Sequence, residues 1–347
     1  MCARKIQMPR EVYIGPGVVH ETGEICSSLK LFKDIVLVTG NNTYDIAAKP
    51  TISSLEEYDF NIDIVKVHEA SFDSVNEVKE LTTENSTVIG IGGGKVIDVA
   101  KLASFDENAY FVSMPTAASH DGMLSPQASI KDSKKATSVK AHAPIAVIGD
   151  SEIIANAPPR LLSAGCADLI SNFTAIKDWK LAHRLKHDSY SSSAASLSLM
   201  SAKLITDNAE NIKPGLEESA RLVIKSLFSS GMAISIAGSS RPASGSEHKF
   251  SHALDLINEK SGLHGEQCGI GTILMMNVYG GDWEFIRDSL KSVGAPTTAK
   301  ELGVSDDDII EALTLAHTIR PERYTILGDN GFSKDAAYEI AIKTGVI

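Results

Sequence analysis

The stretch VIGIGGGKVID, from Val88 to Asp98, predicts a buried strand, a glycine turn and a helix in direct succession. Residues 86–91 are mostly β-branched or apolar, the pattern of an interior parallel strand. Three consecutive glycines follow, and an apolar helical stripe over residues 96–103 begins directly after them. A helix that begins here directs free N–H groups at whatever lies over the glycines, which suits a phosphate.

Two common phosphate-binding motifs do not fit this stretch. The dinucleotide fingerprint G-x-G-x-x-G, started at Gly90, requires a glycine where Lys95 stands, and the P-loop requires a hydroxyl where Val96 stands. Two interpretations therefore stay open. The glycines either cradle a phosphate or only allow the helix to pack tightly on the strand.

Size and charge restrict the class of protein. A chain of 347 residues exceeds the usual limit of a single core, so two domains are expected. Its content of hydrophobic (43%) and charged residues (22%) is that of an ordinary globular protein. A net charge of −11 argues against nucleic acid or an anionic membrane as a partner, and any anionic substrate needs local cations.

The cysteines and the apolar segments indicate the compartment. The four cysteines are scattered without a C-x-x-C pair, which favours a reducing environment over a disulfide framework. No apolar run approaches 18 residues, and the first residues lack the apolar core of a signal peptide. We therefore expect a cytoplasmic protein that does not insert into a membrane.

The first half of the chain alternates strand and helix patterns, which indicates an α/β domain with a parallel sheet. Strands are predicted at residues 35–38, 62–67, 86–91 and 110–115, and two short strands at 127–131 and 137–140. Parallel sheets bind ligands beyond the carboxyl ends of their strands. The loops after Val38, Ile91 and Met114 should therefore lie at one edge, and the third contains the polar stretch from Thr116 to Ser125.

From Pro158 onward the sequence is dominated by helix-forming residues. Helical periodicity is present over residues 161–187, 192–211, 216–237, 247–260 and 268–278. The sequence thus predicts an α/β nucleotide-binding domain over residues 1–157 and a helical domain over residues 158–347.

The helical half contains a candidate metal site. His248 and His252 are four residues apart and share a helix face, although Lys249 rules out the H-E-x-x-H motif. His264 stands at a predicted helix start, and Asp168 stands among small and apolar residues, where a carboxylate must be paired or bind a cation. Spacing alone leaves a metal site and an ordinary structural role equally open.

A second histidine pair and two cysteines compete with this set. His183 and His187 also lie four residues apart, but their neighbours are cationic and no glycine turn follows, so we interpret them as part of a solvated face. Cys166 and Cys268 could serve as ligands in principle, and we interpret them as small core residues.

Four blocks of the sequence together resemble a known family. They are GGGKVID at 92–98, TAASHDG at 116–122, AGCAD at 164–168, and the set His248, His252 and His264-Gly265-Glu266. The combination is similar to the archaeal sn-glycerol-1-phosphate dehydrogenases, in the larger group of glycerol dehydrogenases, iron-type alcohol dehydrogenases and dehydroquinate synthases. It extends from about Ile6 to about Leu327. The resemblance implies a dehydroquinate synthase-like fold, with an N-terminal parallel-sheet nucleotide domain and a C-terminal all-helical metal-binding domain.

The resemblance also implies an activity and the residues that perform it. The family reversibly reduces dihydroxyacetone phosphate to sn-glycerol 1-phosphate with NADH or NADPH and one zinc per subunit, which begins archaeal ether phospholipid synthesis. The metal ligands would be Asp168, His248 and His264. Asp121 and His252 would be catalytic residues that face the substrate, and Asp168 would also contact it. The implied cofactor-binding residues are Gly94, Lys95, Val96, Ile97, Asp98, Thr116, Ala117, Ala118, Ser119 and Ser125.

This assignment is chemically consistent. Two imidazoles and one carboxylate leave an open position on zinc, as in catalytic rather than structural sites. The ion would polarise the ketone while the cofactor supplies hydride. A proton must then reach the product oxygen, and His252, one helical turn from a ligand, is the candidate relay.

Several alternatives remain at this level. The nearest is a zinc- or iron-dependent dehydrogenase of free glycerol or another small polyol on the same fold, while dehydroquinate synthase and a catalytically silent dinucleotide sensor match less well. The loop from Gly40 to Thr43 has neither an acid for a ribose hydroxyl nor an arginine for a 2′-phosphate, so use of both NAD and NADP is expected. The resemblance also implies a homo-oligomer, either a dimer or an octamer.

The substrate phosphate is the feature that the sequence specifies least. Lys249 adjoins a metal ligand but points about 100° away from it around the helix, so no role is assigned to it. Arg320 and Arg323 flank Pro321, which interrupts any helix there. They form either a surface turn with Glu322 or the phosphate site.

Overall fold

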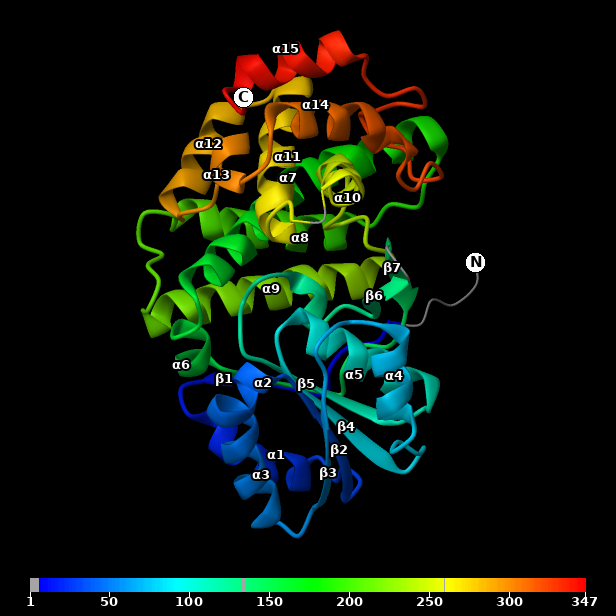
Figure 1. The fold of residues 1–347 in the computed structure, drawn as a ribbon, viewed down its shortest axis with the longest axis vertical. Coiled ribbons are helices and arrows are strands. Elements are labelled where there is room, and N and C mark those ends of the chain that lie inside the picture. The colour runs from blue at the N-terminus through cyan, green and yellow to red at the C-terminus, as the bar shows by residue number, and fades with distance from the viewer. Residues whose placement is uncertain (1–5, 133–134, 259) are drawn as a thin grey trace. The chain divides into compact units, whose positions relative to one another are not determined.

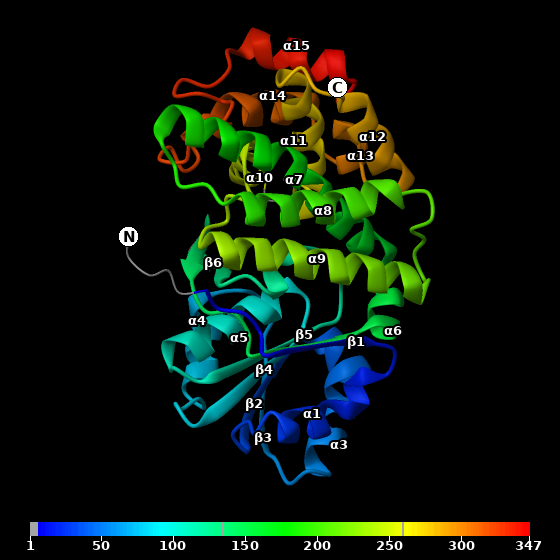
Figure 2. The same ribbon diagram turned by 180° about the vertical axis from the view of Figure 1, so that it is seen from behind.

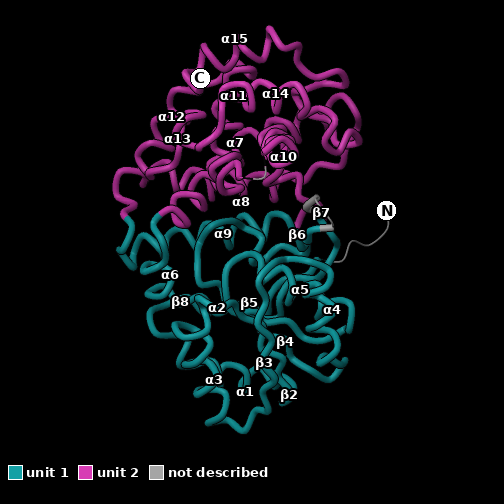
Figure 3. Tube along the Cα trace, viewed as in Figure 1, with its two compact units in different colours: residues 1–159, 214–235 teal, residues 160–213, 236–347 magenta. Residues whose placement is uncertain are grey.

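The structure is a computed structural model that describes residues 6–132, 135–258 and 260–347 (Figure 1). The chain divides into two compact units, Met1–Pro159 with Pro214–Ser235 and Arg160–Lys213 with Ile236–Ile347 (Figure 3). The sequence predicts a single boundary after residue 157. The grouping of residues 214–235 with the first unit differs from that prediction. Most of α9 (Glu217–Ala237) lies in this segment. It packs on the sheet because Gly149 has no side chain: a Cβ there would lie 2.6 Å from Ile224 Cδ1.

The first unit is built on a six-stranded sheet in which all neighbouring strands are parallel, in the order β1-β8-β5-β4-β2-β3. The strands predicted from the sequence are all present. β1 and β8 are not among the predicted strands, and the edge strand β1 pairs with β8, far along the chain. The strands are β1 (Glu11–Gly15), β2 (Asp34–Thr39), β3 (Asn61–Lys66), β4 (Ser86–Gly92), β5 (Tyr110–Pro115) and β8 (Ala146–Asp150).

Helices cover both faces of this sheet, which explains why its strands are continuously apolar. Alternate residues of β2 enter opposite cores: Val36 and Val38 pack with α4 (Phe72–Lys79) and α5 (Gly94–Asp106). Ile35 and Leu37 pack with α1 (Thr22–Ser28) and α3 (Lys49–Glu56). Figures 1 and 2 show α4 and α5 on one side of the sheet and α1 and α3 on the other.

The parallel register brings the predicted ligand-binding loops to one edge of the sheet. Thr39 pairs with Ile91, and Gly92 pairs with Pro115, so β2, β4 and β5 end side by side. The loop after β2 continues into the short α2 (Asn41–Thr43), and the loop after β5 contains a 3₁₀ turn at Asp121–Met123. An antiparallel pair, β6 (Gln127–Asp132) and β7 (Lys135–Lys140), follows it, and α6 (Ser151–Ala155) follows β8.

The described part of the second unit is helical, as predicted. Its longest helix, α7, runs from Pro159 to Lys186 and carries Asp168 on a buried face. The other helices are α8 (Ser192–Asp207), α10 (Ser246–Ile257), α11 (His264–Val278), α12 (Trp283–Ser292), α13 (Ala299–Leu302), α14 (Asp306–Leu315) and α15 (Lys334–Thr344). The sequence correctly predicts α7, α8 and α10 and a helix start at His264, where α11 begins, although its helical periodicity is recognised only from residue 268. It does not predict α12 to α15.

Among the described residues, only α9 is long and apolar enough to cross a membrane. Of its most apolar window, 61% is buried, which is typical of a core helix in a globular protein.

Candidate active site

The glycine turn lies at the carboxyl end of β4 and opens α5. Gly93 is the N-cap of α5, with extended backbone angles, and its carbonyl accepts hydrogen bonds from the N–H groups of Val96 (3.0 Å) and Ile97 (3.2 Å). The Thr116 N–H donates to the Gly92 carbonyl (3.0 Å), which ties the loop after β5 to the turn. The first N–H groups of α5 thus remain available to an anion.

The glycines do not all serve the same purpose. A Cβ on Gly90 would lie 2.8 Å from Ala100 Cβ, and one on Gly92 would lie 2.8 Å from Val96 Cγ2, so both allow α5 to pack closely on β4. A Cβ on Gly93 would meet nothing within 4 Å. The packing interpretation therefore explains Gly90 and Gly92, whereas Gly93 faces open space, as a phosphate cradle requires.

A small pocket adjoins the turn, and many of the residues predicted to bind the cofactor lie around it. Its walls include Gly94, Ile97, Ala117, Ser119 and His120.

The remaining predicted cofactor residues are not part of the pocket lining. Val96 and Ala118 are buried, and Lys95 is exposed. The Ser125 hydroxyl is directed at the Gln127 carbonyl (3.4 Å). Asp98 forms an ion pair with the buried Lys101 (3.1 Å) and accepts a hydrogen bond from the backbone of the β6 strand, so its carboxylate is engaged within the protein.

His120 is a neighbour of the turn that the sequence does not single out. Its Nδ1 accepts a hydrogen bond from the Gly122 N–H (3.0 Å), and a Cβ on Gly94 would lie 2.1 Å from its Nε2. The imidazole therefore lies directly against Gly94. The signal was present, because His120 belongs to the block TAASHDG, but only the folded loop brings its ring to the glycines.

Asp121, one of the two predicted catalytic residues, lies in the first unit. Its Oδ2 accepts a hydrogen bond from the Ser230 hydroxyl on α9 (2.9 Å). A Cβ on Gly231 would lie 2.7 Å from Leu124 Cβ, so the 3₁₀ turn packs closely against α9. These contacts fix the position of Asp121 at the end of the loop after β5.

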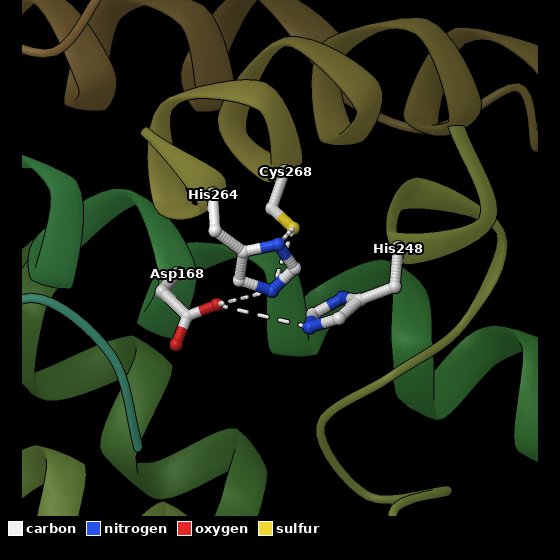
Figure 4. Close-up of side chains that lie close together, drawn as sticks. All are labelled: Asp168, His248, His264 and Cys268. Atoms are coloured by element: carbon white, nitrogen blue, oxygen red, sulfur yellow. Dashed lines mark hydrogen bonds and ion pairs between the residues drawn. The ribbon is translucent and has the colours of Figure 1, made fainter. Parts of the chain in front are cut away.

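In the second unit, α7, α10 and α11 bring together the three predicted metal ligands (Figure 4). Asp168 Oδ1 lies 3.8 Å from His248 Nε2 and 4.0 Å from His264 Nε2, and the centroids of the two rings are 4.8 Å apart. Together with Cys268, these residues form a group whose potential ligand atoms all lie within 4.8 Å of one another. One carboxylate oxygen and two imidazole nitrogens at this separation fit a divalent metal such as zinc.

Cys268 lies closer to this group than the sequence suggests. It follows His264 by one turn of α11, and its Sγ lies 3.6 Å from His264 Nε2. Burial, and then the Asp168 carboxylate, raises the pKa of the Cys268 thiol well above its usual value. Cys268 is therefore a fourth donor within reach of the group, beside the three predicted ligands.

His252, the other predicted catalytic residue, stands beside the metal group but is not one of the four. Its ring centroid lies 5.7 Å from that of His264. Burial, followed by the neighbouring His264, His248, Arg320 and Arg323, holds the pKa of His252 well below its usual value. The imidazole is therefore neutral near pH 7.

The competing histidine pair does not approach this site. His183 and His187 are both exposed, and neither belongs to a potential metal group among the described residues. His183 Nδ1 lies 2.6 Å from the Asp188 carbonyl, and its ring stacks on Tyr190. This arrangement agrees with the interpretation of the pair as part of a solvated helix end.

Four basic residues, Lys249, Arg241, Arg320 and Arg323, form what we call the cation cluster. Arg323 donates to the Ser244 carbonyl (3.0 Å) and the Ser240 hydroxyl (2.9 Å). Burial, and then the charges of Arg320 and Arg241, lowers the pKa of Arg323 to about 10. Arg323 is thus directed inward and is not paired with Glu322 in a surface turn.

Lys249 is the member of this cluster that the sequence analysis dismissed. The residue is 3% exposed, and its ammonium forms no hydrogen bond or ion pair among the described residues, although the Asp178 and Glu322 carboxylates act on it electrostatically. Burial is the main reason that the pKa of Lys249 falls to about 8, and the cations Arg241 and Arg323 lower it further. An ammonium whose charge is disfavoured by burial and that forms no direct ion pair is stabilised further by an added anion.

The chain is similar to known dehydrogenases along its whole length. Residues 13–158 match the family model described as iron-containing alcohol dehydrogenase. The chain is 74% identical to a glycerol-1-phosphate dehydrogenase [NAD(P)+] of Methanobrevibacter smithii and 59% identical to one of Methanothermobacter thermautotrophicus, with 100% of each chain covered. Its fold matches that of a probable glycerol dehydrogenase from Sinorhizobium meliloti with a TM-score of 0.82, at 20% identity over 99% of this chain and 98% of that one.

These matches confirm the resemblance inferred from the sequence and the predicted fold class. The solved structure establishes the fold alone, whereas the full-length relatives establish the family. The chain belongs to the glycerol-1-phosphate dehydrogenases, within the fold group of the glycerol dehydrogenases and iron-containing alcohol dehydrogenases.

Proposed function

We propose that this protein reversibly reduces dihydroxyacetone phosphate to sn-glycerol 1-phosphate with NADH or NADPH, the first step toward the backbone of archaeal ether phospholipids. The full-length relatives support the reaction, since their names specify the same product and cofactors. Asp168, His248 and His264 supply a donor set suited to one zinc ion per subunit. When bound, zinc would polarise the ketone, and the nicotinamide cofactor would supply the hydride.

The observation that carries the choice of a phosphorylated substrate is Lys249, a largely buried residue whose ammonium forms no direct ion pair among the described residues. A free polyol gives a buried cation no counter-charge, whereas a phosphate satisfies it and adds charge-assisted hydrogen bonds. Arg320 and Arg323 contribute to the same positive potential, and both act on His252 beside the metal ligands. We assign the substrate phosphate to the cation cluster.

The remaining residues have supporting roles in this proposal. The glycine turn and the start of α5 bind the cofactor pyrophosphate, with Gly94, Lys95, Val96, Ile97 and Asp98 on the helix side. Thr116, Ala117, Ala118, Ser119 and Ser125 line the rest of its path. Asp121 orients the substrate by hydrogen bonding.

His252 relays a proton to or from the substrate oxygen, directly or through water. Its low pKa keeps the ring neutral, so that it can accept the alcohol proton in the oxidation direction.

We extend the proposal to the cellular form of the enzyme. Asn41 and Asn42, exposed at the loop after β2, carry no charge to select between NAD and NADP, which supports the use of both. We further propose a cytoplasmic homo-oligomer, a dimer or an octamer, with small molecules rather than nucleic acid or membrane as its binding partners.

The test is NADH and NADPH oxidation with dihydroxyacetone phosphate and with dihydroxyacetone, by enzyme with and without added zinc. We expect zinc-dependent turnover that strongly prefers the phosphorylated ketone. Lys249→Met should raise the KM for dihydroxyacetone phosphate about 10- to 100-fold, the loss of one hydrogen bond to a charged group, and leave dihydroxyacetone unaffected.

Lys186→Met is the matched control, because this exposed lysine lies in the same unit, where it forms a surface ion pair with Asp329 (3.4 Å) and a cation–π contact with the Tyr324 ring (4.8 Å). Equal activity on both ketones, or an equal effect of Lys249→Met on both, would refute the assignment of the phosphate to this cluster.

A further inference from the structure

The two histidines of the metal group have different partners on the ring nitrogen that faces away from the metal. His248 Nδ1 lies 2.9 Å from Glu247 Oε1, and His264 Nδ1 lies 3.0 Å from the Ser251 hydroxyl. Adjacent residues of a helix normally point in different directions, so the contact between Glu247 and His248 requires an unusual local arrangement.

That arrangement arises where α10 begins. Glu247 is in the first turn of α10, and its Oε1 also accepts a hydrogen bond from the N–H of Gly245, the N-cap residue. Its Oε2 accepts one from the Thr174 hydroxyl on α7 (2.7 Å). Gly245 makes this possible, because a Cβ there would lie 2.9 Å from Glu247 Oε2 and 2.6 Å from Asp178 Oδ2.

The direction of the hydrogen bond to His248 follows from this environment. Glu247 is fully buried, and the main-chain N–H of Gly245 and the Thr174 hydroxyl donate to it. The Thr174 hydroxyl also lies 3.0 Å from the Ser171 carbonyl, so it has a second acceptor if residue 247 does not accept its hydrogen. A carboxylate only accepts hydrogen bonds, so His248 must donate from Nδ1–H and keep a lone pair on Nε2.

The direction of the bond to His264 is set by a chain of neutral groups. The Gln267 amide nitrogen donates to Asp255 Oδ1 (2.8 Å) and to the Ser261 hydroxyl (2.7 Å), which turns its carbonyl oxygen toward Ser251. The Ser251 hydroxyl donates its one hydrogen to that carbonyl. The serine oxygen can then only accept from His264 Nδ1–H, which leaves the lone pair of His264 on Nε2, the atom that lies 4.0 Å from Asp168 Oδ1.

We propose that Glu247 and Ser251 are positioning residues for the metal, which hold the proton of each histidine on Nδ1 so that both Nε2 atoms face Asp168 as ready ligands. This inference rests on the proposed metal site. It adds that the ligand atoms are oriented before the ion binds. The Glu247 carboxylate fixes His248 through Nδ1, and the Ser251 hydroxyl with the Gln267 amide fixes His264 through Nδ1. Partners of this kind fix ring orientation and typically change metal affinity 10- to 100-fold when they are removed.

Two measurements test the proposal. The first is ¹⁵N NMR of the metal-free wild-type enzyme with labelled histidine, where we expect the Nδ1–H form at both His248 and His264. The second is the zinc dissociation constant, measured by competition with a chelator. Glu247→Ala should raise this constant about 10- to 100-fold, and the His248 signal should lose its preference for Nδ1–H.

Glu247→Gln should retain the Nδ1–H form and recover most of the affinity. Its carbonyl oxygen can still accept from His248, and its amide can donate to Thr174, whose hydroxyl has the Ser171 carbonyl as another acceptor. Asp178→Asn is the matched control. Asp178 is an equally buried carboxylate that accepts from Ser246 and Tyr279 and from neither ligand histidine.

Three results would overturn the inference: an Nε2–H form of His248 in the metal-free enzyme, wild-type zinc affinity in Glu247→Ala, or an equal loss of affinity in Asp178→Asn. If Glu247→Ala does not fold, the wild-type NMR spectrum and the zinc affinity of Glu247→Gln still test the inference. If the enzyme binds zinc as described but does not reduce dihydroxyacetone phosphate, the proposed function fails while this inference stands.

Discussion

The substitution Lys101→Met tests how the cofactor loop is attached to α5. Lys101 is 0% exposed, and its three ammonium protons have three acceptors: Asp98 Oδ1 (3.1 Å), the Gln127 carbonyl (2.8 Å) and the Gly122 carbonyl. Methionine fills a similar volume, but it leaves Asp98 with only the hydrogen bond from the Ser129 N–H (3.1 Å) among the described residues and removes the donor from two carbonyls. Breaking a buried ion pair by removing one partner costs about 3–5 kcal/mol.

This cost should be measured in the first unit specifically. Both tryptophans, Trp179 and Trp283, lie in the second unit, so their fluorescence does not report on it. Hydrogen exchange of peptides from residues 95–104 and 119–130 reports directly on the stability of the first unit. A loss of about 3 kcal/mol or more accelerates exchange there by about a hundredfold or more, and the KM for NAD(P)H should rise as the loop loosens.

Two further variants make the test sharper. Lys79→Met removes a partly exposed ion pair with Asp106 (2.9 Å) at the other end of α5 and should cost about 1 kcal/mol or less. Adding Asp98→Asn to Lys101→Met should recover part of the loss, because the carboxylate left without its cation becomes neutral. Exchange in Lys101→Met within twofold of that in Lys79→Met would refute the reasoning.

Three other predictions follow from the structure. Gly93→Ala should weaken NADH binding at least tenfold without lowering stability, since its Cβ meets only open space, whereas Gly94→Ala should also lower stability by displacing His120. Fluorescence titration with NADH and thermal unfolding distinguish the two variants. Unchanged NADH affinity in Gly93→Ala would show that the glycine turn serves packing only. Asp168→Asn, His248→Ala and His264→Ala should each lose bound zinc and turnover, while His183→Ala stays within twofold of wild type by metal analysis and assay; the reverse pattern would show that the ion binds elsewhere. Burial lowers the pKa of His142 to about 4 from an unfolded value of 6.5, so the native state resists protonation and loses up to about 3 kcal/mol as the pH falls from 6.5 toward 4. Urea midpoints measured against pH should show this loss in wild type and a smaller one in His142→Gln, and parallel curves would contradict it.

Local sequence patterns were sufficient to predict the α/β half of the fold. Val36, Leu37 and Val38 point to alternating faces of the sheet, and all three are apolar because helices cover both faces. Each strand of a parallel sheet must be apolar on both faces for this reason, so each can be recognised separately. β1 was missed because one exposed and four half-buried residues at a sheet edge carry too weak a pattern, and their partner β8 lies about 130 residues further along the chain.

The chemical identity of the metal group was also visible in the sequence. Helix geometry placed His248 and His252 on one face, and the ligand set Asp168, His248 and His264 followed from the family resemblance. What spacing could not decide was the choice between the two histidine pairs. That depends on α7, α10 and α11 meeting at Asp168, which is a property of packing and not of any one helix.

The electrostatic roles of individual residues were decided by the tertiary structure alone. A lysine in a helical sequence normally extends into solvent, yet Lys101 and Lys249 are both buried, one fully paired and the other unpaired. Likewise, Glu247 is an ordinary first-turn acid in the sequence, and only the fold places Thr174 and His248 around it. Burial and pairing arise from residues distant along the chain, so the sequence determined which chemical groups were present, and the packing of the helices determined which of them carry unsatisfied charge.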